Sequence, residues 1–207
     1  MRAKQNTMAN IPGFFEGTGM PDTEWWAALW PDPVKVLAQV GIKQHMTVVD
    51  LCCGDGWFTW PIGKLCRYVT AIDIDGALLE TAKRRASDHG VTNCDFMQGD
   101  AYDLDKMLRA PVDMVFLANA FHGVPDKPRL AKAVAANLKP EGLFVIVNWH
   151  ALAREKTTLL CEARGPATTL RMTPEATVAS VTPSGLVLRE VVELKPYHYA
   201  AIFRKAS

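Results

Sequence analysis

The sequence of 207 residues lacks the features that define several classes of protein. No apolar run approaches the roughly 18 residues of a membrane span, and the opening MRAKQNTMAN has no apolar core of a signal peptide. The five cysteines are odd in number and none is spaced as C-x-x-C, which argues against a disulfide framework and a structural zinc site. We therefore expect a reduced, cytoplasmic protein with no metal site.

Net charge is almost absent as well. Lys plus Arg (23) nearly cancels Asp plus Glu (22), so the net charge of +1 supplies no overall field that would attract nucleic acid or anionic lipid. With 49% hydrophobic residues the chain can bury a substantial core, and its length fits one domain with one sizeable addition. We expect no nucleic-acid partner and no stable membrane insertion, and a homo-oligomer is compatible with the sequence.

From about Thr47 onward, short apolar runs alternate with stretches of helical period, which is typical of parallel βαβ units. Apolar residues recur every four positions from Leu78 to Ala86 and again from Leu130 to Leu138, as crossover helices require. The predicted parallel strands are 47–52, 68–73, 94–98, 112–118 and 143–149.

Thr173 followed by Pro174 predicts the N-cap and first residue of a further helix. Two last strands, 188–194 and 198–203, are separated by too few residues for a parallel crossover, so they should form an antiparallel hairpin. The fold class expected is therefore α/β and doubly wound. Its sheet should have seven strands, mostly parallel, with an antiparallel C-terminal hairpin strand and helices on both faces.

The most informative stretch is VVDLCCGDGWFT, in which an apolar strand carrying Asp50 enters a loop with Gly54 and Gly56. In open α/β sheets ligands bind outside the carboxyl ends of the strands, and glycines let the backbone approach them closely. The dinucleotide fingerprint G-x-G-x-x-G fails, because Thr59 stands at its third glycine. With no lysine to hold a phosphate, the loop suits a cationic or zwitterionic nucleoside such as S-adenosylmethionine.

Acidic residues also end the next two predicted strands. Asp73 closes the second strand, where a carboxylate can accept hydrogen bonds from both ribose hydroxyls. The third strand leads to Asp100 and Ala101, whose carboxylate and backbone N–H can meet the edge of an adenine, while Ile74 can cover the ring. Carboxylates at the ends of three consecutive predicted strands indicate a nucleoside site.

With these residues the sequence resembles the class I S-adenosylmethionine-dependent methyltransferases over about residues 46–150. The first motif of that family has an acid and three alternate glycines, and this chain carries Cys52 at the first glycine. The cysteine is tolerable at this position if the backbone there has a negative φ. The stretch ANAFHGVPD is similar to the small-molecule branch, whereas base-modifying members usually carry an N/D-P-P-Y motif at this place.

The resemblance implies that S-adenosylmethionine is the cofactor and S-adenosylhomocysteine the product. It implies that the glycines lie under the methionine part, that Asp73 holds the ribose, and that Asn119 lies beside the methionine tail. The cofactor-binding residues carried over in this way are Asp50, Cys52, Gly54, Gly56, Asp73, Ile74, Asp100, Ala101 and Asn119.

Methyl transfer from a sulfonium is a direct displacement, so catalysis depends on alignment and on exclusion of water, and a base is needed only for a protonated acceptor. The candidate catalytic residues are Asn119 and two possible bases, His122 and His150, which follow the fourth and fifth strands. Hydrogen bonding to loop backbone is the alternative role of each histidine. Arg164 and Arg171 lie in the aperiodic segment 151–172, either as ligands of an acceptor carboxylate or phosphate or as solvated surface residues.

Residues 1–40 lie outside the strand and helix alternation and are rich in aromatic residues. We expect them to form an N-terminal aromatic cap or lid, followed by a methyltransferase domain over 41–207. Three roles are open for this segment: capping the core, lining an acceptor pocket, or lying in a membrane interface, against which the scarcity of basic residues argues. The aromatic residues concerned are Phe14, Phe15, Trp25, Trp26 and Trp30.

The sequence thus predicts a methyltransferase that uses S-adenosylmethionine and a small-molecule acceptor. One alternative is a nicotinamide-dependent oxidoreductase on the same Rossmann-like fold, against which Thr59 argues. Another alternative is a non-catalytic nucleoside-binding module, which the polar residues Asn119, His122 and His150 disfavour.

Overall fold

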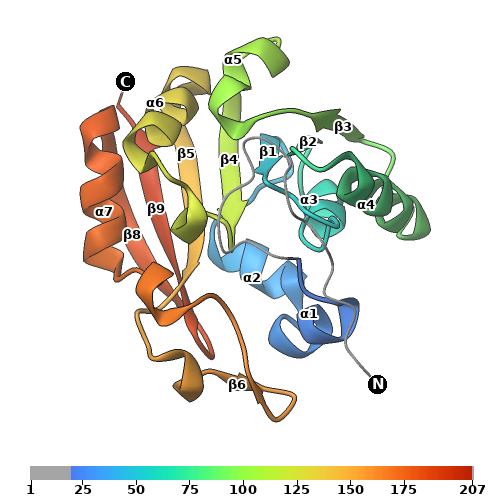
Figure 1. Ribbon diagram of the computed structural model, residues 1–207. Helices are drawn as coiled ribbons and strands as arrows, with labels where there is room; N and C mark the ends of the chain where they lie inside the picture. Colours follow the sequence, from blue (N-terminus) through green and yellow to red (C-terminus); the bar gives the residue numbers. More distant parts are fainter. Residues whose placement is uncertain (1–19, 207) are drawn as a thin grey trace.

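The computed structural model describes residues 20–206, so the expected cap residues Phe14 and Phe15 lie outside the described range. Its centre is a seven-stranded sheet (Figure 1). The strands are β1 (Thr47–Leu51), β2 (Tyr68–Asp73), β3 (Cys94–Gln98), β4 (Val112–Ala118), β5 (Leu138–Trp149), β8 (Leu186–Leu194) and β9 (His198–Lys205). Their order is β3-β2-β1-β4-β5-β9-β8, and β9 runs antiparallel to the other strands. The predicted doubly wound α/β sheet is confirmed.

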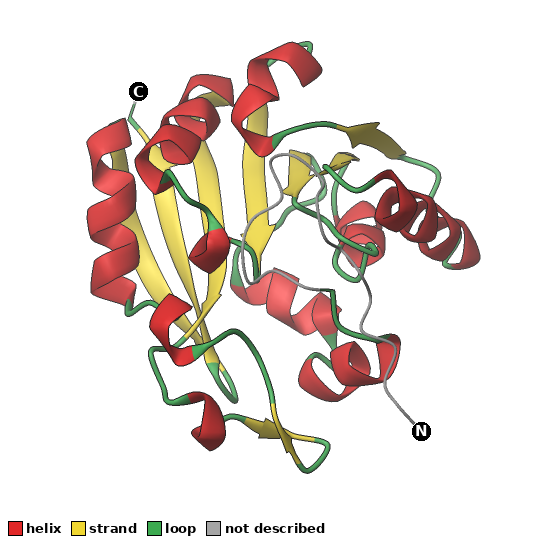
Figure 2. Ribbon diagram, viewed as in Figure 1, coloured by secondary structure: helices red, strands yellow, loops and turns green. Residues whose placement is uncertain are grey.

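Helices cover both faces of the sheet (Figure 2). One face carries α1 (Thr23–Leu29), α2 (Pro33–Gln39), α3 (Thr59–Leu65) and α4 (Gly76–Asp88). The other carries α5 (Leu104–Met107), α6 (Lys127–Asn137) and α7 (Pro174–Val181). Within residues 20–206, none of these helices combines the length and the apolar character needed to cross a bilayer.

Side-chain caps fix where several helices begin. Asp22 accepts a hydrogen bond from the backbone N–H of Trp25 at the start of α1, and Asp75 caps α4 in the same way. Thr173 accepts from the N–H of Ala176 and Pro174 is the first residue of α7, as predicted from the sequence. Each cap satisfies a donor that the first helical turn would otherwise leave unpaired.

The strand ends differ from the sequence prediction at several places. The apolar repeat that ends at Leu138 predicted a helical residue there, but Leu138 pairs with Val112 of β4 and begins β5. Tertiary pairing has overridden the helical period. Strand β1 ends at Leu51, one residue earlier than predicted, because Cys52 leaves the extended region. Strand β8 begins at Leu186 and β9 extends to Lys205, so both are longer than predicted.

A short antiparallel hairpin, β6 (Thr158–Leu159) and β7 (Glu162–Ala163), lies in the segment that carried no readable periodicity. Two-residue strands are too short to show an alternation of apolar and polar residues. The hairpin belongs to the long connection between β5 and α7 and lies at the same end of the molecule as α1 (Figure 1).

Trp30, which follows α1, packs into the core beneath the sheet. Its side chain is 2% exposed, and its ring centroid lies 5.8 Å from that of Phe58 and 4.6 Å from that of His198. Leu29 and Leu37 are buried in the same apolar cluster as the sheet residues. The part of the expected N-terminal cap that the structure describes therefore contributes to the core.

Candidate active site

A cavity of about 740 Å³ opens at the carboxyl ends of β1, β2, β3 and β4. It lies where the sequence analysis placed the ligand, outside the carboxyl ends of the parallel strands. Gly56 and His150 do not line it. The site residues predicted from the sequence that do line it are Asp50, Cys52, Gly54, Asp73, Ile74, Asp100, Ala101, Asn119 and His122.

The loop after β1 needs its two glycines for different reasons. Gly54 has φ +55° and donates its backbone N–H to Asp73, with 2.8 Å between nitrogen and Oδ2. Gly56 has φ +80°, and a Cβ there would lie 2.7 Å from the Cβ of Ala82 on α4. Gly56 thus permits the loop to pack on α4, whereas Gly54 faces the pocket.

Cys52, at the family's first glycine position, has φ +56°. The condition of a negative φ, under which the cysteine would be tolerated without strain, is therefore not met. The backbone at Cys52 adopts the left-handed conformation between β1 and the loop, which costs a non-glycine residue roughly 1–2 kcal/mol. Such strain, retained beside a pocket, is a common feature of functional sites.

Asp73 connects the end of β2 to the glycine loop. Its Oδ2 accepts from the N–H of Gly54 and its Oδ1 accepts from the N–H of Asp75, at 2.8 and 2.9 Å. Each carboxylate oxygen has lone pairs beyond these bonds, so it can accept further hydrogen bonds from a ligand. Burial raises the pKa of Asp73 and the two N–H donors oppose this rise.

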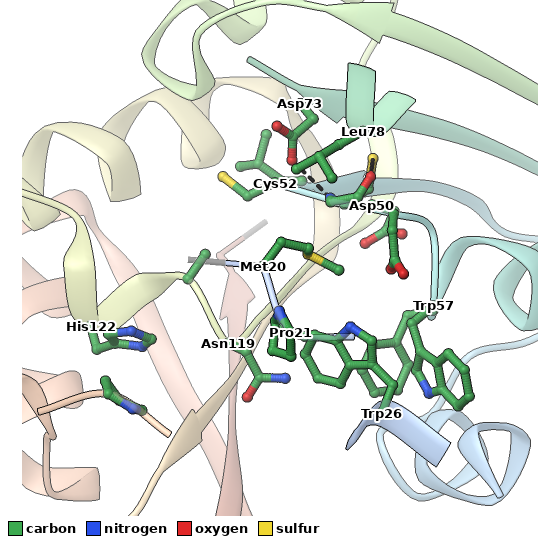
Figure 3. A pocket seen from close by; sticks show the side chains of 18 of the residues that line it. Met20, Pro21, Trp26, Asp50, Cys52, Trp57, Asp73, Leu78, Asn119 and His122 are labelled. Carbon is green, nitrogen blue, oxygen red and sulfur yellow. Dashed lines mark hydrogen bonds between the residues drawn. The ribbon is translucent and has the colours of Figure 1, made fainter. Parts of the chain in front are cut away.

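Asp50, on β1, also lines the pocket (Figure 3). It is 2% exposed, and its Oδ2 accepts a hydrogen bond of 2.6 Å from Oγ1 of Thr59. Burial raises the pKa of the Asp50 carboxyl to about 7, although the bond from Thr59 lowers it. A nearby cation would favour the ionised form of this carboxyl.

Beyond β3, Asp100 accepts a hydrogen bond of 2.9 Å from the N–H of Tyr102 and so caps a short 3-10 helix. Ala101 is buried directly after it. Ile74 and Leu78 lie on the β2 side of the same pocket end. A carboxylate, a backbone turn and two apolar side chains together suit a flat heterocycle with polar edges.

Asn119 follows β4 and takes φ +59°, another strained position for a non-glycine residue. Its backbone N–H donates to the carbonyl of Val147 at 2.9 Å. Its side-chain Oδ1 and Nδ2 are buried and have no hydrogen-bond partner among residues 20–206. A buried amide that lacks partners costs roughly 1–3 kcal/mol, which a bound polar ligand would recover.

The two candidate bases have different surroundings. His122 is 4% exposed, lines the pocket and comes from the short 3-10 helix after β4 (Figure 3). The Nε2 of His150 lies 3.0 Å from Oε2 of Glu193 on β8, and its ring packs against Tyr199. The structure therefore brings His122 to the pocket beside Asn119 and leaves His150 outside it.

Tryptophans form the pocket wall opposite the strand-end carboxylates. Trp25 and Trp26 of α1 and Trp149 at the end of β5 all line the pocket and are nearly fully buried. This burial is inconsistent with the membrane-interface role considered for the N-terminal tryptophans. Of these tryptophans, Trp30 is in the core, whereas Trp25 and Trp26 face the pocket.

The sequence analysis missed several pocket residues. Trp57 directly follows Gly56, and Leu78 lies on the first turn of α4, so their positions relative to the glycine loop and to Asp73 could have identified both. Met20, whose sulfur lies 2.8 Å from where a Cβ of Gly54 would be, had no local signal. Arg154 lies in the aperiodic segment, which gave no means of choosing among its arginines.

Comparisons with known proteins agree with this geometry. Residues 48–142 match a family model described as a methyltransferase domain. The chain is similar to methyltransferase gedG of Aspergillus terreus, with 33% identity over 98 residues, or 47% of this chain and 30% of that protein. It is also similar to the demethylmenaquinone methyltransferase of Lactococcus lactis, with 28% identity over 120 residues, or 55% of this chain and 46% of that protein.

A solved structure extends the likeness over most of the fold. The crystal structure of a SAM-dependent methyltransferase from Aquifex aeolicus matches with a TM-score of 0.74 and 22% identity, covering 88% of this chain and 93% of that chain. At this identity the likeness establishes the fold. The matched region spans less than half the length of the two curated relatives.

Proposed function

We propose that this chain is a class I S-adenosylmethionine-dependent methyltransferase that transfers a methyl group from S-adenosylmethionine to a small-molecule acceptor. One observation carries the proposal. The glycine loop, the carboxylates Asp50, Asp73 and Asp100, and the unpartnered amide of Asn119 all line one pocket.

The residues present fit such a cofactor. Asp73 would accept from the ribose hydroxyls with the lone pairs that its two backbone donors leave free. Asp100 and Ala101 would meet the adenine edge, with Ile74 and Leu78 against the ring. Gly54 brings backbone without a Cβ to the pocket, where a ligand chain would take the place of the Met20 side chain, and Asp50 offers a negative charge to an ammonium group.

Asn119 supplies both a hydrogen-bond donor and an acceptor. It lies between the strand-end carboxylates, which form the cofactor side of the pocket, and the tryptophan wall, which forms the acceptor side. Its amide is buried and has no partner among residues 20–206, so it can bind the amino-acid tail without first losing a bond within the protein. The strained φ of this residue holds the side chain toward the pocket.

When bound, the cofactor supplies an electrophilic methyl group on a sulfonium. A lone pair of the acceptor forms the new bond to the methyl carbon while the carbon–sulfur bond breaks and its electrons stay on sulfur. His122 would take the proton that a protonated acceptor loses. The tryptophans of α1 and Trp149 would exclude water from this end of the pocket.

A small acceptor is supported by the shape of the site and by its charge. The pocket is walled by α1 and by the connection after β5, which leave a cavity of about 740 Å³. The chain has a net charge of only +1. One relative is named for demethylmenaquinone, which is a small molecule.

The nicotinamide alternative has less support. Thr59 occupies the third position of the dinucleotide fingerprint, and its hydroxyl is committed to Asp50 in the buried first turn of α3. A glycine is favoured at that position in dinucleotide sites because helix and strand approach closely there.

Transfer of a tritium-labelled methyl group from S-adenosylmethionine tests the proposed reaction. Purified protein is incubated with separate small-molecule, RNA and protein fractions of a cell extract. Label should enter the small-molecule fraction, and Asn119→Ala should strongly reduce it, with Asn137→Ala as control, because the half-buried Asn137 on α6 does not line the pocket. Label that enters only RNA or protein would contradict the small-molecule assignment, and no transfer to any fraction would favour a non-catalytic module.

A further inference from the structure

The pocket wall that faces the acceptor carries arginines as well as tryptophans. Arg154, from a 3-10 helix that spans Arg154–Lys156, and Arg164, just after β7, both line the cavity. The connection to which they belong, residues 151–172, contains four basic and two acidic residues. The carboxylates of the pocket lie instead on the cofactor side and at the start of α1.

Arg154 is fixed at both ends but forms no ion pair with a described residue. Its backbone N–H donates to Oγ1 of Thr168 at 3.0 Å, and its Nε donates to the carbonyl of Gly165 at 3.1 Å. Over residues 20–206 no carboxylate lies within 4 Å of its guanidinium. Both terminal nitrogens are therefore available for a planar, two-oxygen ligand.

Arg164 uses only part of its hydrogen-bonding capacity within the described part of the chain. One terminal nitrogen lies 2.8 Å from Oε2 of Glu162, while its Nε is buried and has no hydrogen-bond partner in the described part of the chain. A buried guanidinium N–H without an acceptor is costly unless a ligand supplies one.

Arg171 stabilises the segment that carries these arginines through hydrogen bonds outside the cavity. It is 7% exposed and donates to Oγ1 of Thr157 and to the carbonyls of Arg164 and Pro166, at 2.8–3.1 Å. Its guanidinium also lies over the ring of Trp149, 4.9 Å from the centroid. Burial lowers the pKa of Arg171, the charge of Arg154 lowers it further, and the charge of Glu155 opposes this shift.

The tryptophans next to these arginines present flat apolar surfaces. The ring centroid of Trp25 lies 4.7 Å from that of Trp26 in an edge-to-face arrangement, and 6.1 Å from that of Trp149. Aromatic walls of this kind favour a planar ring, which can stack or pack edge-on against them.

We infer that the acceptor is an aromatic compound with an oxyanion, a carboxylate or a phosphate, that Arg154 and Arg164 bind while the ring packs against Trp25, Trp26 and Trp149. This inference rests on the proposed function, since it names the acceptor class of the same pocket. Arg171 is a positioning residue, because it fixes the backbone that carries Arg164 and does not itself line the cavity.

Calorimetric titrations of the full chain saturated with S-adenosylhomocysteine test the inference, with benzoate, phenyl phosphate and neutral benzamide as probes. At least one of the two anions should bind more tightly than benzamide, and the comparison between them separates carboxylate from phosphate. Arg154→Gln and Arg164→Gln should each weaken anion binding about 10-fold. The matched control is Arg189→Gln on β8, whose guanidinium is exposed and pairs only with Glu190 among described residues.

If S-adenosylhomocysteine binds but benzamide binds as tightly as the anions, or no anion binds at millimolar concentration, the acceptor class is wrong and the proposed function stands. Unchanged anion affinity in both arginine variants would also overturn the inference. If S-adenosylhomocysteine itself fails to bind, the proposed function fails and the acceptor class fails with it. Unaltered melting temperatures would show that the variants are folded.

Discussion

The cofactor side and the acceptor side of the pocket are built in different ways. Every proposed cofactor residue lies in a strand or within a few positions of its end, so the sheet alone places them. The acceptor side joins α1, the end of β5 and the connection after it, which are far apart in the sequence. The cofactor residues are therefore marked in the sequence by the ends of strands, whereas no local signal marks the acceptor side, whose segments meet only in the folded chain.

The two sides also differ in charge. Carboxylates with raised pKa values, Asp50 and Asp73, face one end of the pocket, while arginines and tryptophans face the other. A ligand pair with a cationic cofactor and an anionic acceptor matches this polarity. Five predictions test this difference between the two sides of the pocket.

The largest effect is expected from Trp30→Ala. Trp30 belongs to the core rather than to the pocket, so its removal should lower the free energy of unfolding by about 3–5 kcal/mol. Urea unfolding monitored by circular dichroism measures this loss. Trp60→Ala is the matched control, because Trp60 is only half-buried and stacks on His89 at 3.9 Å. Equal losses in the two variants would show that α1 is not anchored in the core.

His122→Ala should lower turnover by about 100-fold while leaving cofactor affinity unchanged, because a general base contributes to the chemical step alone. His150→Ala is the internal control and should turn over normally, since its ring lies against Glu193 and Tyr199 outside the pocket. Steady-state kinetics with a labelled methyl donor measures both. Should His150→Ala prove the slower of the two, the assignment of the base to the pocket side would be wrong.

Asp73→Ala should weaken S-adenosylhomocysteine binding by roughly 1–3 kcal/mol, because the ribose would lose its acceptors. Asp105→Ala, an exposed carboxylate on α5, should bind as the wild type does. Calorimetry gives the affinities, and thermal melting of each variant accounts for the hydrogen bonds that Asp73 also accepts from the loop. An unaltered affinity in a folded Asp73→Ala protein would remove Asp73 from the ribose site.

Cofactor binding should depend on pH through Asp50. Its pKa of about 7 lies above the ordinary 3.8, so the fold favours the protonated carboxyl and the free energy of unfolding should fall as pH rises between these values. An ammonium ligand favours the ionised form. The affinity for S-adenosylhomocysteine should therefore fall about 10-fold between pH 8 and pH 6. Asp50→Asn should bind with little pH dependence, and an identical slope in this variant would contradict the assignment.

The smallest effect is expected from Cys52→Gly. Glycine adopts the φ of +56° without the steric cost that the cysteine bears, so the folded state should gain roughly 1 kcal/mol before the greater flexibility of the unfolded chain is subtracted. Chemical denaturation compares it with Cys52→Ala, which keeps the strain. Cofactor affinity should be retained in Cys52→Gly. A marked destabilisation would show that the thiol packs in a way that outweighs the strain.

The contrast between the two sides also explains what could be predicted from the sequence. The bounds of β2, β3 and β4 followed from short apolar runs ended by turn residues, and with them came the positions of Asp73 and Asp100. The positive φ of Cys52 could not be deduced from the sequence. A glycine signals a possible left-handed backbone conformation, but a cysteine at the same position carries no such signal.

The acceptor side carried less local information. Arg164 was singled out but Arg154 was not, because the β6–β7 hairpin that brings both to the pocket has strands too short to leave a pattern. His150 follows its strand just as His122 does, yet the side chain packs toward β8. Which way a residue after a strand end turns depends on tertiary contacts that the sequence pattern does not encode.

The central claim is that the strand-end carboxylates and the glycine loop bind S-adenosylmethionine rather than a dinucleotide. The most direct measurement is calorimetric titration of the purified protein with S-adenosylhomocysteine, NAD and NADP under identical conditions. The account predicts micromolar binding of S-adenosylhomocysteine and no binding of either dinucleotide. Binding of NAD or NADP without S-adenosylhomocysteine would contradict it and would point to hydride transfer on this fold.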